Sequence, residues 1–250
     1  MFEPQLALAS LSGEADAEWG LAAADRAGAA FLGGIAIDEQ SRSAARELVA
    51  RDRKEFLPAD PLAFIDDQLA AVADADGAIR PGINVRSTTV EPIRRVAAIC
   101  AEHDAILEIN AHCRQEEVCA VGCGETLLAD TDRLAEYVVA AETAPAVSVK
   151  VRAEVDGVDL TAVAERVAAA GADAIHVDAM DSEFVIGEVA AAADLFVIAN
   201  NEVRDRASVR EYFEYGADAV SVGRPSRDPD GRVFGRVANA VAKVEPEPTP

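Results

Sequence analysis

Three side chains of different chemistry lie close together in the sequence, because Asn110, His112 and Cys113 fall within four positions. The run before them, residues 105–109, is predominantly apolar and short, which predicts a buried strand. An amide, an imidazole and a thiol in the loop after a buried strand are typical of the reactive loops of α/β proteins. A strand end with a capping Asn and a half-buried Cys is the alternative interpretation.

Lys150 is the second candidate, since it interrupts the apolar run 147–151 of a chain that otherwise almost lacks lysine. The other two lysines are Lys54 and Lys243. An ammonium group inside a core strand needs an anionic partner to offset its lost hydration. We therefore expect Lys150 to face an anion, the alternative being a side chain that extends from the strand end into solvent.

Polar residues also follow, or end, the other expected strands. In a barrel of alternating strands and helices the carboxyl ends of the strands meet on one face, and barrel enzymes act on that face. The sequence therefore predicts one site assembled from many strands. Its candidate members are Ser10, Ser12, Gly33, Gly34, Asn84, Arg86, Asn110, His112, Cys113, Lys150, Arg152, His176, Asn200, Asn201, Gly223 and Arg224.

Two of these loops have the composition of a phosphate site. Asn200 and Asn201 follow the seventh expected strand, and Gly223 and Arg224 follow the eighth. The loops after strands seven and eight are where such barrels commonly bind phosphate, with backbone N–H groups and an Arg as donors. Ordinary turns built from Asn and Gly are the alternative.

The elements that must position these residues alternate regularly along 250 residues. We expect strands at residues 5–9, 29–37, 79–85, 105–109, 146–151, 174–177, 195–199 and 219–222, with helices between them, the first at 14–27. Segments 170–174 and 215–219 are near copies, as repeating strand–helix units produce. The fold class is therefore an α/β protein, a single-domain (β/α)8 TIM barrel over residues 1–243, followed by a disordered, acidic, Pro-rich tail at 244–250. A doubly wound sheet is the alternative, although no GxGxxG follows the first strand.

The net charge is −22, from 45 acidic residues against 23 Lys and Arg. Such acidity favours a protein of a saline, halophilic cytoplasm, where a strongly hydrated surface keeps the protein dispersed. Because molar salt screens charges within about 3 Å, the acidity argues only weakly against a nucleic-acid partner. Neither a secretion signal nor a membrane-spanning run is expected, and four cysteines are too few for a disulfide scaffold, so we expect a cytoplasmic protein. His103 is expected at the surface, and Cys119 and Cys123 as buried apolar residues.

Several of these segments resemble one enzyme family. INAHC at Ile109–Cys113 and GCGETLL at Gly122–Leu128 resemble the N-x-G-C-P … G-x-G-x-x-L-L segment of the tRNA-dihydrouridine synthases, and VKVR at Val149–Arg152 resembles their V-K-x-R strand. His176 falls at the position of their strand-six histidine. Asn200, Gly223 and Arg224 fall at their FMN-phosphate loops. The resemblance covers about residues 1–240.

This resemblance implies a flavoenzyme. FMN would cross the barrel mouth, with its phosphate near Asn200, Asn201, Gly223 and Arg224 and its ring system near Ser10, Ser12, Asn84 and Lys150. Lys150 would stabilise the anionic reduced flavin, and NADPH would be the reductant. Hydride would pass to C6 of a flipped-out uracil in tRNA while Cys113, as general acid, protonates C5. Asn110, Arg152 and His176 would hold the base or the flavin, with His176 also a catalytic candidate.

The sequence departs from the family pattern at three points. His112-Cys113-Arg114 replaces Gly-Cys-Pro, and Asn200–Asn201 replaces Asn-Gly. The chain ends soon after the barrel, where the family normally has a helical tRNA-binding domain. Two other functions therefore stay open. One is a flavoenzyme resembling dihydroorotate or dihydropyrimidine dehydrogenases that acts on a free pyrimidine base. The other is a phosphate-binding barrel without flavin, a lyase or isomerase in which Lys150 forms a Schiff base or binds phosphate.

Overall fold

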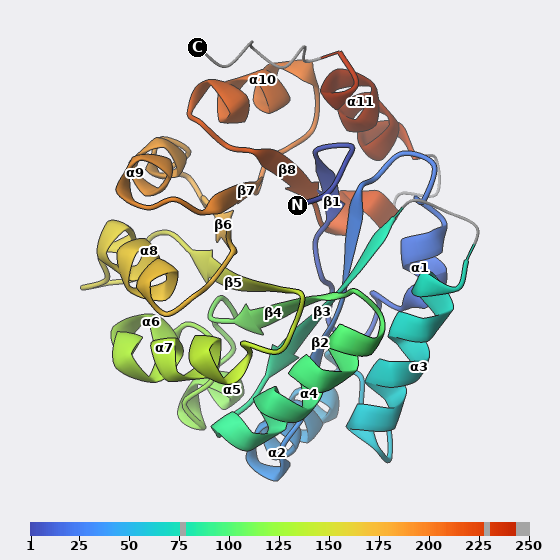
Figure 1. The fold of residues 1–250 in the computed structure, drawn as a ribbon, viewed down its shortest axis with the longest axis vertical. Coiled ribbons are helices and arrows are strands. Elements are labelled where there is room, and N and C mark those ends of the chain that lie inside the picture. Colours follow the sequence, from blue (N-terminus) through green and yellow to red (C-terminus); the bar gives the residue numbers. More distant parts are fainter. Residues whose placement is uncertain (76–78, 228–230, 244–250) are drawn as a thin grey trace.

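Eight parallel strands close into a barrel in the computed structural model, which describes residues 1–75, 79–227 and 231–243. Each strand pairs with the next along the chain, and the last pairs with the first. Figure 1 shows the strands at the centre and the helices as an outer ring around them. The strands are β1 (Leu6–Leu8), β2 (Ala29–Ala36), β3 (Arg80–Arg86), β4 (Ile106–Asn110), β5 (Ala146–Arg152), β6 (Ala174–Asp178), β7 (Phe196–Asn200) and β8 (Ala219–Val222).

The helices begin where the abundant aspartates can accept hydrogen bonds from free backbone N–H groups. Asp38, Asp60, Asp159 and Asp205 cap four of them in this way. The helices of the described residues are α1 (Ala17–Leu21), α2 (Glu39–Ala50), α3 (Pro61–Ala73), α4 (Val90–Glu102), α5 (Glu116–Ala120), α6 (Thr126–Ala129), α7 (Thr131–Ala140), α8 (Leu160–Ala169), α9 (Val185–Ala192), α10 (Arg206–Glu214) and α11 (Arg232–Val241), with a short 3-10 helix η1 at Arg224–Arg227.

The predicted fold class is confirmed, and most predicted elements lie within two residues of the observed ones. The first helix differs, because α1 covers only 17–21 of the expected 14–27. The Asp16 side chain caps it at the Trp19 N–H, and after Leu21 the chain continues as successive tight turns, such as the one closed by Ala24 N–H and the Leu21 carbonyl. Within the described residues no helix is long and apolar enough to cross a bilayer. The expected tail at 244–250 lies outside the described residues.

The strand ends position the polar residues. Five strands end on a polar residue, one residue beyond each predicted end, namely Arg86, Asn110, Arg152, Asp178 and Asn200. In β2 the pairing register with β3 shifts between Gly33 and Ile35, as a β-bulge produces. The carboxyl ends of the strands thus bring the predicted polar set to one end of the barrel.

Candidate active site

A cavity of about 350 Å³ opens at the carboxyl end of the barrel. It lies at the loops after β1, β7 and β8 and extends to side chains of β5 and β6. Its walls therefore come from both halves of the chain. The lining residues are Ala9, Ser10, Leu11, His112, Lys150, Asp178, Asn200, Asn201, Glu202, Val203, Arg204, Ser221, Val222, Gly223, Arg224 and Pro225.

Lys150 is an incompletely partnered cation in this cavity. The residue is only 4% exposed, and among the described residues its Nζ has one hydrogen-bond partner, Ser10 Oγ at 3.5 Å. Burial lowers the pKa of Lys150, while the charges of Glu108 and Asp178 oppose that shift. A buried ammonium group with one weak contact is well suited to a bound anion or electron-rich group.

The loops after β7 and β8 form the second part of the cavity. Asn200 Nδ2 donates to Ser221 Oγ at 2.7 Å, and Asn201 Nδ2 donates to the Met180 carbonyl at 2.7 Å, so the end of β7 is tied to β8 and to the loop after β6. Arg224 is exposed at the cavity wall and has no ion-pair partner among the described residues. This end of the cavity can therefore receive an anion such as phosphate.

A chain of hydrogen bonds crosses the barrel beneath the cavity. Asn110 Nδ2 donates to Asn84 Oδ1 at 2.9 Å, and Asn84 Nδ2 donates to Glu108 Oε1 at 2.7 Å. The other carboxylate oxygen of Glu108 lies 2.7 Å from His176 Nδ1. His176 Nε2 lies 2.8 Å from Ser221 Oγ, which links the chain to the loops of β7 and β8.

The electrostatics of this interior chain favour an anionic Glu108 and a neutral His176. Burial opposes ionisation of Glu108, but the adjacent His176, the charge of Lys150 and the hydrogen bond from Asn84 hold the pKa of its carboxyl below the usual value. Burial lowers the pKa of His176, and Lys150 adds to that shift against the opposing effect of Glu108. A neutral ring can donate from Nδ1 to Glu108 and accept from Ser221.

A second His–carboxylate pair lies in the cavity wall itself. His112 Nε2 lies 2.7 Å from Asp178 Oδ2, and the side chains are 31% and 15% exposed. The backbone N–H of Met180 donates to the other carboxylate oxygen at 3.2 Å. His112 thus has a fixed carboxylate partner and open access to the cavity.

A family model described as "Dihydrouridine synthase (Dus)" matches residues 83–249, which is more than half of the chain. This chain belongs to the dihydrouridine synthase family. The family membership predicted from the INAHC, GCGETLL and VKVR segments is therefore confirmed. As a member of this family the chain is an FMN-dependent oxidoreductase on a TIM barrel.

Similar proteins agree with this fold. An uncharacterized protein of Methanocaldococcus jannaschii is 25% identical over 236 residues, covering 89% of each chain. Among solved structures, DHODH of Eimeria tenella in complex with ferulenol has a TM-score of 0.69 at 15% identity, over 95% of this chain and 80% of that one. Morphinone reductase in complex with tetrahydroNAD has a TM-score of 0.62 at 12% sequence identity, over 93% of this chain and 87% of that one. A FabK (M276A) mutant from Thermotoga maritima has a TM-score of 0.58 at 16% sequence identity, over 89% of this chain. This chain spans 61% of the length of that FabK chain.

The residues expected to bind FMN, taken together with Cys113 as the expected general acid, fall into three groups in this member of the dihydrouridine synthase family. Six line the cavity, and three lie beneath it in the interior chain of hydrogen bonds. The remaining three are beside the cavity or apart from it, and Arg152 among them pairs with Glu125 at 2.6 Å. The first group is Ser10, Lys150, Asn200, Asn201, Gly223 and Arg224, the second is Asn84, Asn110 and His176, and the third is Ser12, Arg152 and Cys113.

Cys113 does not belong to the described residues that line the cavity. Its side chain packs against the small apolar cluster of Leu48, Val118 and Cys123. Cys123 is buried, as predicted, and burial raises the pKa of its thiol to about 12, whereas Cys119 is only half-buried. Its neighbour His112, by contrast, lines the cavity.

The cavity fits FMN in the chemistry of its donors. One part of the cavity is lined by three kinds of hydrogen-bond donor. They are the nearly buried ammonium group of Lys150, the hydroxyl of Ser10 and the side-chain amides of Asn200 and Asn201. Arg224, without an ion-pair partner among the described residues, stands at the phosphate loops. Lys150 and Ser10 would hold the ring system, and Arg224 with the backbone after β8 would hold the phosphate.

Sequence reasoning missed two carboxylates of the site. Glu108 is the charged residue of the run 105–109, and a carboxylate inside an otherwise apolar strand is a signal that could have identified it. Asp178 ends β6, two residues after His176, so its side chain lies on the same strand face. His103 was expected at the surface, but its ring is 17% exposed and pairs with Asp66 at 2.6 Å.

Proposed function

We propose that this chain reduces the C5=C6 bond of uracil in tRNA, with FMN as cofactor and NADPH as reductant. The observation that carries the proposal is Lys150, a buried ammonium group that lines the cavity and has one hydrogen-bond partner, at 3.5 Å, in the part of the chain that the structure describes. When bound, reduced FMN supplies the hydride. The charge of Lys150 would favour the electron-rich, reduced ring system over the oxidised one, which makes hydride available for transfer.

The other residues of the site orient the reactants. Arg224 and the backbone of the β8 loop would hold the phosphate of FMN and so would anchor that end of the cofactor. His176, held by Glu108 and Ser221, and Asn84 with Asn110 form a rigid floor under the cavity. We propose that the proton for C5 comes from the loop 111–114, in which Cys113 is the donor expected from the resemblance.

A free pyrimidine base is the second candidate substrate. The net charge of −22 opposes binding to the phosphate backbone in dilute buffer, and it does so much less in molar salt. The same cavity, Lys150 and phosphate loops would serve either substrate. A cytoplasmic location and adaptation to a saline cytoplasm stay predictions from composition.

The proposal is tested with protein purified in molar salt. A flavin absorption spectrum, with FMN released on denaturation, is the first expected result. The flavoprotein, reduced with NADPH, is then mixed with an unmodified tRNA transcript or with free uracil, and dihydrouridine or dihydrouracil is quantified. Dihydrouridine in the transcript supports the tRNA proposal, and product from free uracil alone supports the second candidate. A colourless protein that takes up no added FMN overturns both and leaves the barrel without flavin.

A further inference from the structure

His112 lies where a reacting group of a bound substrate can meet it. It follows the carboxyl end of β4, and its ring lines the same cavity as Lys150 and Asp178. The loop is held at its start, because the backbone N–H groups of His112 and Cys113 donate to Asn110 Oδ1 at 3.2 and 3.0 Å. Asn110 in turn is tied to the barrel floor through Asn84. The start of the loop that carries His112 is thus fixed to the barrel.

Asp178 determines which nitrogen of the His112 ring is available. A carboxylate accepts, so Nε2 of His112 carries the hydrogen in the 2.7 Å contact with Asp178 Oδ2. Nδ1 has no hydrogen-bond partner among the described residues and is left as the ring's free proton acceptor. A His–Asp pair that fixes the tautomer and leaves one bare nitrogen is the arrangement of a proton-transfer residue.

We propose that His112, rather than Cys113, moves the substrate proton in this site, with Asp178 as its positioning residue. The inference rests on the proposed function, since it needs a bound substrate whose C=C bond is reduced. Two observations separate the two neighbours. His112 lines the cavity, whereas Cys113 packs its side chain against Val118 and Cys123.

The proton step balances with the hydride that the flavin supplies. In reduction, hydride adds to one carbon of the C=C bond while the Nδ1–H bond of the His112 imidazolium breaks and a C–H bond forms at the neighbouring carbon. The product gains two electrons and two hydrogens, and neutral His112 takes its next proton from solvent. By microscopic reversibility the neutral ring would accept that proton when the saturated substrate is oxidised.

The charged groups around His112 set the pH at which it can act. Burial lowers its pKa, the charges of Lys150 and Arg152 add to that shift, and the hydrogen bond and charge of Asp178 oppose it. His176 is a further titratable group, beneath the cavity. Because Asp178 raises the pKa of His112, its removal shifts the protonation of the ring, and the reduction rate that depends on it, to lower pH.

The first test uses the protein without added ligand. The chain has three histidines, so ¹⁵N NMR with one His→Gln variant for each assigns every ring. The expected result is an Nε2–H tautomer for His112 and a titration below its ordinary value of about 6.5. Asp178→Asn should lower that pKa further and abolish the tautomer preference. A His112 ring that titrates identically in wild type and Asp178→Asn overturns the inference.

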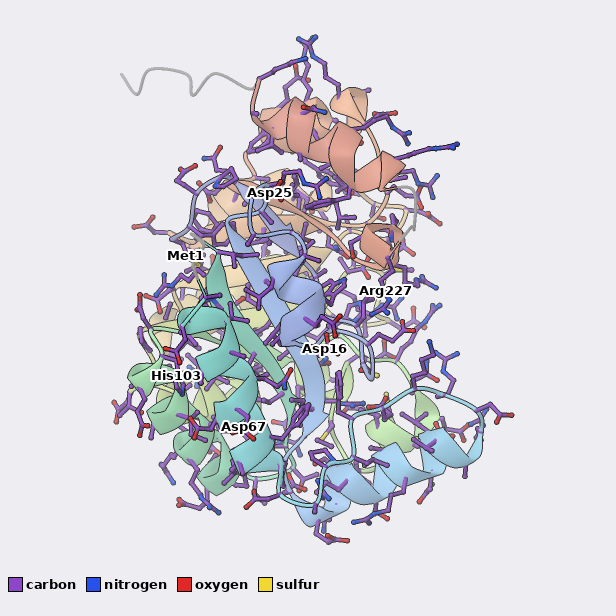
Figure 2. The ribbon with its side chains drawn as sticks, turned by 90° about the vertical axis from the view of Figure 1, so that its right-hand side faces the viewer. Met1, Asp16, Asp25, Asp67, His103 and Arg227 are labelled. Carbon is purple, nitrogen blue, oxygen red and sulfur yellow. The ribbon has the colours of Figure 1, made fainter. Side chains whose placement is uncertain are left out.

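The second test separates the proton step from flavin chemistry. His112→Gln should bind FMN and be reduced by NADPH as the wild type is, yet transfer hydrogen to the tRNA transcript, or to uracil, about 100-fold more slowly or worse. Its residual rate should lose the wild-type dependence on pH. The control is His103→Gln, because His103 also pairs with a carboxylate but lies beside Met1, on the side of the molecule opposite Arg227 (Figure 2).

The outcomes distinguish the two proposals. A wild-type protein without flavin, or without product from either substrate, refutes the proposed function. The other outcome is a wild type that binds flavin and forms product, with a His112→Gln variant that keeps the rate and pH profile and a Cys113→Ala variant that loses activity. That outcome refutes the role of His112 and leaves the proposed function standing.

Discussion

Glu108 Oε2 lies 2.7 Å from Nδ1 of His176, and both side chains are completely buried in the barrel. The pair is the centre of the hydrogen-bond chain that runs from Asn110 to Ser221. Such a polar core is stable only while each member has its partner, since an unpaired buried group is costly. The site floor should therefore respond sharply to changes at Glu108.

Glu108→Ala should destabilise the protein strongly, because Asn84 Nδ2 and the His176 Nδ1–H each lose their acceptor. Each unpaired group costs about 1–3 kcal/mol of unfolding free energy. Glu108→Gln should cost less, because neutral His176 can change tautomer and accept from the new amide. Urea denaturation of both variants measures the difference. Equal losses for Ala and Gln would contradict the role of the hydrogen-bond chain.

The free energy of unfolding should fall as the pH falls from about 7 to about 5. His176 and His112 have lowered pKa values in the folded protein, whereas in the unfolded chain each histidine has its ordinary pKa of about 6.5. The unfolded chain therefore binds more protons than the folded one in this pH window. Glu108, with its lowered pKa, adds a further loss as the pH drops below about 4.5. Urea midpoints at fixed salt test this.

The matched comparison is His176→Asn, whose midpoint should depend less on pH, with some dependence left from His112. A wild-type midpoint that stays constant or rises toward pH 5 would be contrary to this assignment of charges.

Gly34→Ala should damage the site floor without touching the cavity wall. A Cβ at residue 34 would lie 2.5 Å from Asn84 Oδ1, so the amide that connects Asn110 to Glu108 must move. We expect a loss of about 1–3 kcal/mol in unfolding free energy. The control is Gly235→Ala in α11, where a Cβ meets nothing within 4 Å and should stabilise by about 0.5–1 kcal/mol. Similar effects of the two substitutions would argue against the prediction.

The fold was predictable because each strand is a short apolar run between turn residues, and eight such runs occur along the chain with helical segments between them. The site face followed from the fold, since strand ends of a barrel converge. Lys150 was found because a lysine inside an apolar strand is chemically costly, and the structure places it in the cavity.

The partners of these residues could not be predicted in the same way. Glu108, Ser221 and Asp178 matter through contacts made across 24 to 68 positions of the chain, which no local pattern encodes. The orientation of the 110–114 loop depends on Asn110 holding two backbone N–H groups. The resemblance therefore suggested Cys113 as the proton donor, while the folded loop places His112 in the cavity wall.

Arg224→Gln should weaken FMN binding but leave riboflavin binding unchanged, because in the proposed site the guanidinium would contact the phosphate alone. Loss of one charged hydrogen bond corresponds to about 1.5–3 kcal/mol, or about 10- to 100-fold in the dissociation constant. Quenching of flavin fluorescence measures both ligands. The control is Arg210→Gln, an exposed arginine paired with Glu214 on α10. Equal losses for FMN and riboflavin would place Arg224 away from the phosphate.

The most direct measurement is an FMN titration of wild type and Lys150→Met in molar salt, with flavin fluorescence as the readout of binding. Lys54→Met is the control, since Lys54 is an exposed lysine that pairs with Glu14. We predict one bound FMN for wild type and Lys54→Met, and an affinity at least about tenfold weaker for Lys150→Met. A wild type that binds no FMN, or a Lys150→Met variant that binds it as tightly, would contradict the account.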